Sequence, residues 1–453
     1  MNTALAIGEP TPQRSVIGEP AEGDHHDHSS VTLRQRIADS NLLSSLVAIA
    51  DQAIVSGTNF VTAVLIGRCC GADQLGVYSL IVSTLALLYG FQEQLITAPY
   101  VMFHHRRRGH ALHRYQGSMF GHQFLFTTLV LIALLVVQQT SILPSAHSDR
   151  LIVVLAVAIP AMLFRAFLRE TALAHCDLPG VLIMDLTLSV VQLGTLSVLW
   201  WNDAVSLQFL FGVIGIMAVL TTCLKLYRER KVFHCRPKFF RLHWHRNFRF
   251  GRWALATHVA GSSTPFLMPW VLFLMHGETA TGQLASCSVI VGVANLLLSG
   301  LSDFLTPRAA LAYQRGGVIR LQRILTSMGG VSLAAIGPVC VVALLFGQSM
   351  LDLLYDSRFP NTGPLVALLT FAVLANAMGN VAGNGLWALN RPRANFVADL
   401  ITLTAAIAGV VVFVRPHGAF GAAIAVLVAA VIGAAARIAI CRREFSAANA
   451  ATA

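Results

Sequence analysis

The sequence predicts an all-α polytopic membrane protein whose twelve transmembrane helices form two six-helix lobes related by a parallel internal repeat. Three observations predict this fold class. Hydrophobic residues make up 55% of the chain, charged residues only 12%, and the mean hydropathy is +0.66, whereas soluble domains contain about 25% charged residues. Apolar runs recur at the length that crosses a bilayer, and the two halves of the chain resemble each other.

The apolar runs also define the domain organisation. Residues 1–45 are polar and are expected to form a disordered cytoplasmic tail; 46–226 form the N-terminal lobe, 227–251 a basic amphipathic cytoplasmic linker, 252–440 the C-terminal lobe and 441–453 a cytoplasmic tail. The predicted spans are 46–67, 76–101, 118–138, 151–171, 181–201, 207–226, 252–275, 282–305, 324–347, 363–387, 396–414 and 418–440.

The distribution of basic residues sets the predicted orientation. Of the 32 Lys and Arg residues, 28 fall in or beside the two terminal tails and the loops predicted on the same side of the membrane as the N-terminus. Four (Arg68, Arg150, Arg358 and Arg415) fall on the opposite side of the membrane. Positively charged segments stay in the cytoplasm. Both termini are therefore expected to be cytoplasmic, and the net charge of +11 indicates contact with membrane lipids rather than nucleic acid.

Short motifs repeat between the two halves. The stretch GADQLG (71–76) after the first span matches GETATG (277–282) after the seventh, and Asp185 matches Asp399. Six helices per half is an even number, so both halves insert with the same orientation and are related by an axis along the membrane normal. Two lobes with a cleft between them are expected.

Polar residues interrupt one face of the first span. Asp51, Gln52, Ser56 and Asn59 lie within less than half of the helix circumference. Lipid cannot satisfy such groups, so this face is expected to contact another helix or a hydrated cavity. Further cavity candidates are Glu93 and Thr97 in the second span, Ser263 in the seventh, and Asn295, Ser299 and Asp303 in the eighth.

Each of these candidates has a structural alternative. Polar side chains between membrane helices often only hydrogen-bond to neighbouring helices, at about 0.6 kcal/mol each, and Asp51 is close enough to the inner end of its helix to reach the interface. Arg165 and Arg169, at positions i and i+4 of the fourth span, could bind a phosphate or could be anchors whose charged ends reach the interface. Catalytic residues, a metal site and a cofactor are not predicted.

Several stretches carry a family resemblance. The segment DQAIVSGTNFVTAVLIGRCCGADQLGVYSL (51–80) resembles the opening of polysaccharide flippases of the multidrug/oligosaccharidyl-lipid/polysaccharide (MOP) exporter superfamily. FLRETALAH (167–175) is similar to the end of their fourth helix, and GNGLWALNRPR (383–393) to their junction of helices ten and eleven. The likeness covers nearly all of the chain after the N-terminal tail.

The resemblance implies a flippase that moves a polyprenyl-diphosphate-linked oligosaccharide across the bacterial inner membrane for surface polysaccharide biosynthesis. Such flippases are expected to place Arg or Lys in a central cavity, and the first, second, seventh and eighth spans have no cation in their middle. The alternative is a multidrug or metabolite exporter of the same superfamily, coupled to H⁺ or Na⁺ through Asp51 or Glu93. An enzyme is not expected, because the outer loops are too short to form a catalytic domain.

Overall fold

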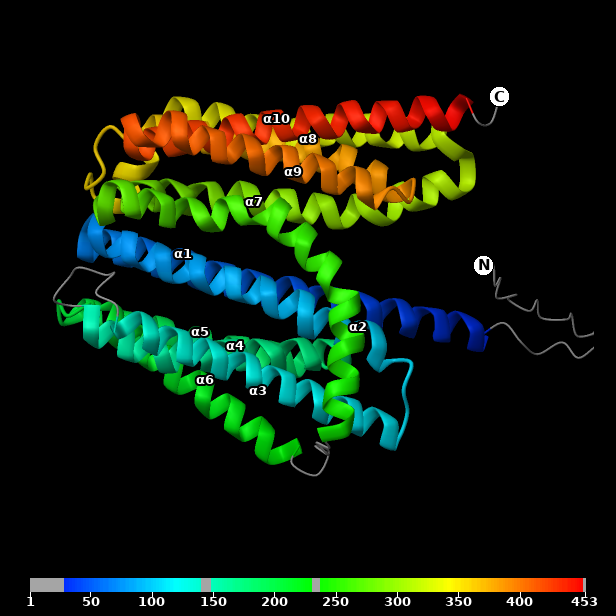
Figure 1. Cartoon of the computed structure of the whole chain (residues 1–453), viewed down its shortest axis with the longest axis horizontal. Coiled ribbons are helices and arrows are strands. Elements are labelled where there is room, and N and C mark those ends of the chain that lie inside the picture. Colours follow the sequence, from blue (N-terminus) through cyan, green and yellow to red (C-terminus); the bar gives the residue numbers. More distant parts are fainter. Residues whose placement is uncertain (1–27, 140–147, 230–236, 451–453) are drawn as a thin grey trace, which may run out of the picture.

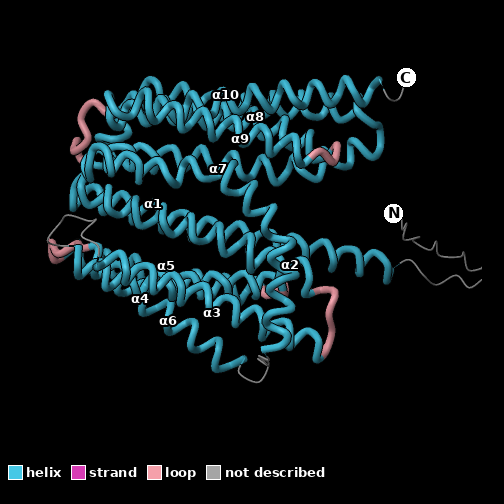
Figure 2. Tube along the Cα trace, in the orientation of Figure 1, coloured by secondary structure: helices cyan, strands magenta, loops and turns pink. Residues whose placement is uncertain are grey.

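Helices account for almost all of the structure, a computed structural model that describes residues 28–139, 148–229 and 237–450. The side chains of 28–45, 148–149, 229, 237–238, 262–263, 303 and 449–450 lie outside this description. The elements are α1 (His28–Gln92), α2 (Ala98–His104), α3 (His110–Gln139), α4 (Ser148–Ala174), α5 (Leu178–Trp201), α6 (Leu207–Glu229), α7 (Pro237–Tyr355), α8 (Gly363–Ala388), α9 (Pro392–Gly409) and α10 (Arg415–Ala450), with π-helical turns η1 (Glu93–Thr97) and η2 (Val410–Val414). Figure 2 shows how short the connecting loops are.

The longest helices are broken at glycines, and the breaks recover the predicted spans. Within the described residues, eight helices are long and apolar enough to cross a membrane. The three longest are Leu46–His104, Thr264–Tyr355 and Pro392–Ala448, the last joining α9, η2 and α10. They contain non-helical glycines: Gly71 in the first, Gly277 and the pair Gly316–Gly317 in the second, and Gly418 in the third. Cutting there yields two, three and two spans, which with the five undivided helices make twelve. The chain is a multi-pass membrane protein, and the fold-class prediction is confirmed.

Two bundles are visible in Figure 1, with α3–α6 on one side, α7–α10 on the other and α1 between them. The internal repeat is visible in the backbone. Gly71 has φ 83° and ψ −171°, and Gly277, its counterpart in the second half, has φ 81° and ψ −169°. This conformation is open almost only to glycine, so both breaks depend on the absence of a side chain.

The two lobes contact each other next to these two breaks. A Cβ atom on Gly76 would overlap the carbonyl oxygen of Glu278, and one on Gly282 would overlap the carbonyl oxygen of Ala72. In each repeat, therefore, a glycine packs against a backbone carbonyl of the other repeat, as the pseudo-two-fold relation requires. Thr279 Oγ1 adds a hydrogen bond across it to Asp73 Oδ1 at 2.5 Å.

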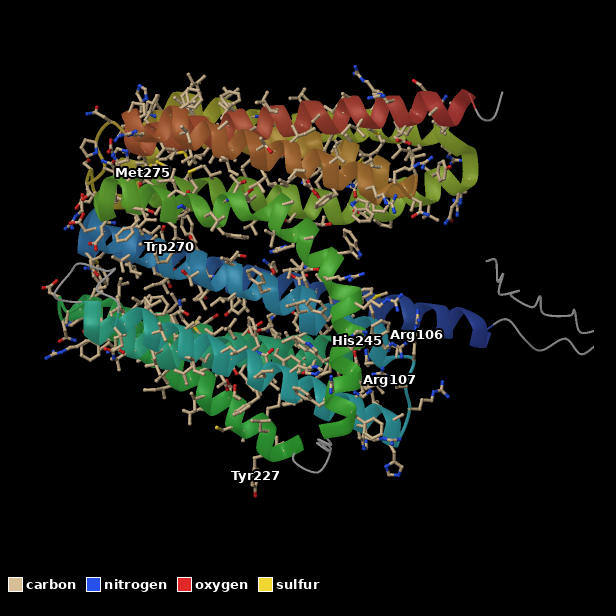
Figure 3. The ribbon with its side chains drawn as sticks, in the orientation of Figure 1. Arg106, Arg107, Tyr227, His245, Trp270 and Met275 are labelled. Atoms are coloured by element: carbon tan, nitrogen blue, oxygen red, sulfur yellow. The ribbon has the colours of Figure 1, made fainter. Side chains whose placement is uncertain are left out.

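The linker packs as a helix across the N-terminal lobe. The first residues of α7 cross the bundle of α3–α6 in Figure 1, and Figure 3 shows Arg106, Arg107 and His245 around this crossing. Tyr115 of α3 donates to Asn247 Oδ1 at 3.3 Å. Phe248 and Trp253 remain exposed.

Helix ends differ from the predictions in two places. Helix α1 begins at His28, before the predicted end of the tail at 45, and α10 continues to Ala450, past the predicted start of the C-terminal tail at 441. Cys441 and Phe445 are buried against the C-terminal lobe. Hydropathy marks only the part of a helix inside the bilayer, so it misses helical turns that extend beyond the membrane. Residues 1–27 lie outside the described residues.

Both π-helical turns have a cause in the sequence. Each ends two residues before a proline, Pro99 after η1 and Pro416 after η2. Proline lacks the backbone N–H, and its ring clashes with the carbonyl of residue i−4, so the regular α-helical pattern cannot continue there. The turn widens, and Ala98 donates its backbone N–H to the Glu93 carbonyl, five residues back. Such wide turns are frequent at functional sites, and η1 carries Glu93 and Thr97.

Candidate functional site

A cavity of about 650 Å³, lined by both polar and apolar side chains, lies within the N-terminal lobe. Its walls come from α1, η1, α4, α5 and α6. Six residues predicted from the sequence line it: Gln52, Asn59, Glu93, Thr97, Arg165 and Arg169. The structure therefore brings together, around one cavity, polar residues that the sequence placed on three separate spans.

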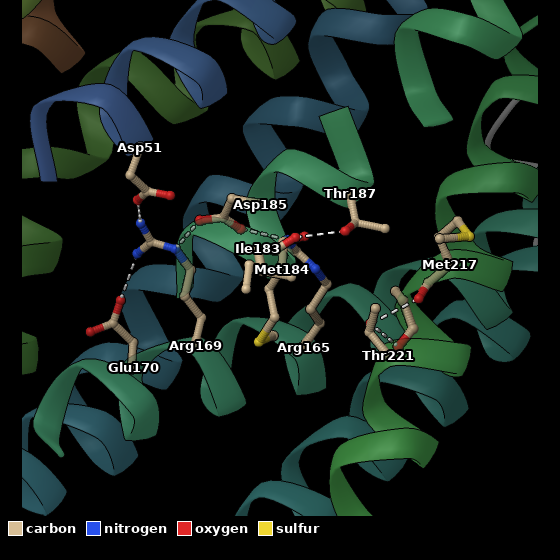
Figure 4. Close-up of polar contacts among 11 residues, drawn as sticks. Asp51, Arg165, Arg169, Glu170, Ile183, Met184, Asp185, Thr187, Met217 and Thr221 are labelled. Atoms are coloured by element: carbon tan, nitrogen blue, oxygen red, sulfur yellow. Dashed lines mark hydrogen bonds and ion pairs between the residues drawn. The ribbon is translucent and has the colours of Figure 1, made fainter. Parts of the chain in front are cut away.

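Arg169 of α4 connects three carboxylates. Its Nη2 lies 2.6 Å from Asp51 Oδ2 of α1, and its Nε lies 2.6 Å from Asp185 Oδ2 of α5. Its Nη1 lies 3.3 Å from Glu170 Oε1. Figure 4 shows the guanidinium between these three groups. A guanidinium presents its donors in a fixed planar fork, so this residue holds the positions of α1, α4 and α5 relative to one another.

Arg165, one turn before Arg169, completes the cluster. Its Nη2 donates to Asp185 Oδ1 at 2.5 Å and to the Met184 carbonyl at 3.0 Å. Its Nε is buried and has no hydrogen-bond partner, and the same holds for Asp51 Oδ1. Buried polar groups normally have partners. Two unpartnered atoms of opposite polarity in one cluster therefore indicate capacity for a further ligand or water.

The cluster and its surroundings carry more negative than positive groups. Arg165 and Arg169 supply the cations, and Asp51, Glu93, Glu170 and Asp185 supply the carboxylates. The Asp185 side chain is only 3% exposed and is paired with both arginines. Glu93 is exposed and lines the cavity. The arginines are thus held by internal carboxylates, and a ligand anion has to compete with them.

The other predicted residues have different surroundings. Ser56 accepts a hydrogen bond from Gln52 Nε2 at 3.1 Å, on the same helix face. Asn295 and Ser299 are exposed, and they line neither this cavity nor the second one described below. The side chains of Ser263 and Asp303 lie outside the described residues.

The prediction from sequence missed the contribution of α5. Asp185 anchors both arginines, and Gln192, one wall of the cavity, donates to Thr62 Oγ1 at 2.8 Å. A signal was present, because Asp185 and Gln192 interrupt a long apolar run and lie seven residues apart, on the same helix face. In the sequence, Asp185 stands out only through its match with Asp399 in the second half.

A second, smaller cavity of about 240 Å³ lies in the C-terminal lobe, among α7, α8, α9 and α10. Asp399 of α9 lies in it and forms an ion pair with Arg437 of α10. The two repeats thus place an aspartate at matching positions, each paired with arginine from a neighbouring helix. The arginine comes from α4 in the first repeat and from α10 in the second.

Outside the membrane spans, the linker helix partly buries a histidine against α3. His243 Nδ1 lies 2.8 Å from Ser118 Oγ. Burial lowers the pKa of His243 to about 4, and the nearby charge of Arg107 adds to the shift. The pKa of Arg107 is itself lowered by burial, and its guanidinium lies 3.5 Å from the centre of the Tyr115 ring. His243 is therefore uncharged at neutral pH.

Comparison with solved structures identifies the fold. An inward-facing multidrug resistance MATE family transporter of the MOP superfamily superposes with a TM-score of 0.73 at 12% identity, covering 89% of this chain and 96% of that one. The chain has the MOP transporter fold. The lipid II flippase MurJ, in an inward closed conformation, superposes with a TM-score of 0.71 at 13% identity, covering 89% of each chain.

A MATE family transporter in an outward-facing conformation gives a lower TM-score, 0.60, at 12% identity, covering 89% of this chain and 95% of that one. No protein-family model and no curated protein matches the sequence. Identities of 12–13% support the MOP fold and leave the substrate to be argued from the site.

Proposed function

We propose that this protein is an alternating-access flippase that moves a polyprenyl-diphosphate-linked oligosaccharide across the bacterial inner membrane for surface polysaccharide biosynthesis. The observation that carries the proposal is the pair of arginines in the wall of the N-terminal cavity. The first, second, seventh and eighth spans offered no such cation. Helix α4 provides two of them, one turn apart, beside hydroxyl and amide side chains of α1 and α5.

The chemistry of the cavity suits an amphiphilic substrate with a diphosphate group. Arginine binds phosphate oxygens through paired N–H donors. Arg165 has a buried Nε without a partner, so it can donate a hydrogen bond to a ligand oxygen without first breaking its bond to Asp185. Gln52, Asn59, Ser189 and Gln192 line the same space and can exchange hydrogen bonds with sugar hydroxyls, while the lipid chain stays in the bilayer.

The inter-lobe contact suits alternating access. It lies at Gly76 and Gly282, next to the breaks at Gly71 and Gly277, which the charge distribution assigns to the outer side. The proposed orientation therefore has the outer side closed, both termini in the cytoplasm and the cavity loaded from the inner leaflet. In this proposal no residue has a catalytic role, and membrane lipids and the lipid-linked oligosaccharide are the partners.

One observation favours a second candidate, an H⁺- or Na⁺-coupled multidrug or metabolite exporter. Four carboxylates surround two arginines in the N-terminal lobe, and Glu93 is exposed in the cavity. An excess of acidic groups attracts cations, so a cationic drug or a coupling ion could bind there.

Transport in reconstituted vesicles separates the two candidates. Purified protein is incorporated into liposomes with a fluorescent, short-chain polyprenyl-diphosphate disaccharide, and movement between leaflets is followed by a quencher that cannot cross the membrane. Wild type is expected to move the probe, and Arg165→Gln to slow it at least tenfold. Arg68→Gln, which changes an exposed arginine, is the matched control. No movement of the lipid probe, together with uptake of a cationic dye that requires Glu93, would favour the exporter.

A further inference from the structure

The C-terminal cavity differs in charge from the N-terminal one. Its only charged residues among the described side chains are Asp399 and Arg437, which neutralise each other as an ion pair. Helix α8, which forms much of its wall, contains no charged residue, whereas α4 of the first repeat carries Arg165, Arg169 and Glu170. A formally neutral cavity has no electrostatic reason to collect a free anion or cation.

A buried acceptor in this cavity lacks a partner. The Asn395 side chain lies in the wall and is 5% exposed. Its Nδ2 donates to the Gly383 carbonyl at 3.1 Å, but its Oδ1 is buried with no hydrogen-bond partner. Leaving such an atom unpaired costs about 1–3 kcal/mol. A ligand hydroxyl that donates to this oxygen would remove that cost.

The neighbouring groups are planar and polar. Asn384 Oδ1 accepts from Thr306 Oγ1 at 2.9 Å, which leaves the amide nitrogen of Asn384 as a donor. Arg437 and Asp399 add further donors and acceptors on the same wall. Side chains of this kind can each exchange two hydrogen bonds with adjacent hydroxyl groups, and adjacent hydroxyls are the defining feature of a sugar.

Trp387 supplies the apolar part of the same wall. Its side chain lines the cavity and is 55% exposed. The face of an indole ring carries negative charge density and attracts polarised C–H groups, so it can stack on the C–H face of a pyranose.

From the unpartnered oxygen of Asn395, the zero formal charge of the cavity and the exposed indole of Trp387, we propose that this cavity binds one neutral pyranose unit. Its volume of about 240 Å³ is below the roughly 300–1,000 Å³ of pockets for drug-sized ligands, so it suits a single sugar rather than an oligosaccharide. Assigning that sugar to the translocated glycan rests on the proposed function. The diphosphate would then contact α4 of one lobe, and a sugar unit α8 and α9 of the other.

Sugar binding can be measured without transport. The full-length protein in lipid nanodiscs is mixed with millimolar glucose, galactose, mannose, rhamnose or N-acetylglucosamine, and saturation-transfer difference NMR reports which sugar binds. At least one is expected to bind, and Trp387→Ala to weaken it by about tenfold or more, equivalent to about 1.4 kcal/mol. Trp387→Tyr, which keeps an aromatic face, should retain most of the binding.

The matched control is Trp201→Ala, because Trp201 is 85% exposed at the end of α5 in the other lobe. This control should bind the sugar as wild type does. Since Trp387 is half exposed, its replacement is expected to leave the protein monodisperse, which size-exclusion chromatography checks. Asn395→Leu should also abolish binding, because it removes the unpartnered acceptor Asn395 Oδ1.

Three outcomes would overturn the sugar site. These are no binding of any sugar by wild type, binding unchanged in Trp387→Ala, or displacement of the bound sugar by inorganic phosphate, which would mark an anion site at Arg437. If flipping of the lipid-linked probe persists while no sugar binds, the sugar site alone fails. If sugar binds as proposed but the probe is not moved, the flippase function alone fails.

Discussion

Replacing Arg169 with glutamine tests the ionic cluster of the N-terminal lobe. Among the described side chains, Arg169 is the only ion-pair partner of Asp51, at 2.6 Å. Asp185, in contrast, also pairs with Arg165. The variant therefore leaves two carboxylates without a cation: Glu170, whose side chain is 41% exposed, and the buried Asp51. The Asp51 side chain is 8% exposed, so little water can compensate.

Removing one partner of a buried ion pair costs about 3–5 kcal/mol, mostly because the remaining charge is left uncompensated. We expect Arg169→Gln to lower the free energy of unfolding by about this amount. Asp51→Asn in the same protein removes the orphaned charge, so the double variant should recover part of the loss. The expected coupling energy is about 1–3 kcal/mol, as for residues in one salt-bridge network.

The assay is reversible unfolding in mixed micelles, with sodium dodecyl sulfate as denaturant and tryptophan fluorescence as signal, for wild type, both single variants and the double variant. Arg68→Gln combined with Asp51→Asn is the control. Arg68 is exposed and lies 17 residues further along α1, about 26 Å away, so these two effects should add. If the effects of Arg169→Gln and Asp51→Asn also add within about 0.5 kcal/mol, the cluster does not act as a unit and the reasoning is refuted.

Three further predictions follow from the topology, the inter-lobe contact and the linker. Reporter fusions after residues 110, 240, 318 and 445 should report cytoplasm, and fusions near 145 and 355 the outside; an outside signal at 240 would contradict the equal orientation of the two halves. Asp73 Oδ1 and Thr279 Oγ1 are 2.5 Å apart, so cysteines at these two positions, in a background without native Cys, should form a disulfide. This disulfide should stop transport until a reductant is added. Transport by the cross-linked protein would show that this contact need not open. The pKa of His243 is lowered from 6.5 to about 4, so the unfolded chain binds more protons between these values, and stability should rise as pH increases from 4 to 6.5 and then level off. His243→Gln should reduce that rise, and an unchanged pH profile of unfolding would argue against the buried contact with Ser118.

The sequence alone determined the helices, their breaks and the two-fold organisation. In lipid, backbone N–H and C=O groups must be satisfied within the chain, so a long apolar run can only form a helix. The glycines at 71 and 277 could be matched by motif because both breaks need the same backbone conformation. The polar face of the first span was also predictable, since the helical period fixes which residues share a face.

Only the tertiary structure decided which polar groups meet. Asp51 and Arg169 are 118 residues apart, and the sequence left Arg169 open between a phosphate ligand and an interfacial anchor. It did not identify Asp185, Asp399 or Arg437 as site residues. The position of a residue along a span sets its depth in the membrane, but packing against neighbouring helices sets the rotation of that span. Contacts between spans depend on that rotation, so composition and periodicity within each span could not supply them.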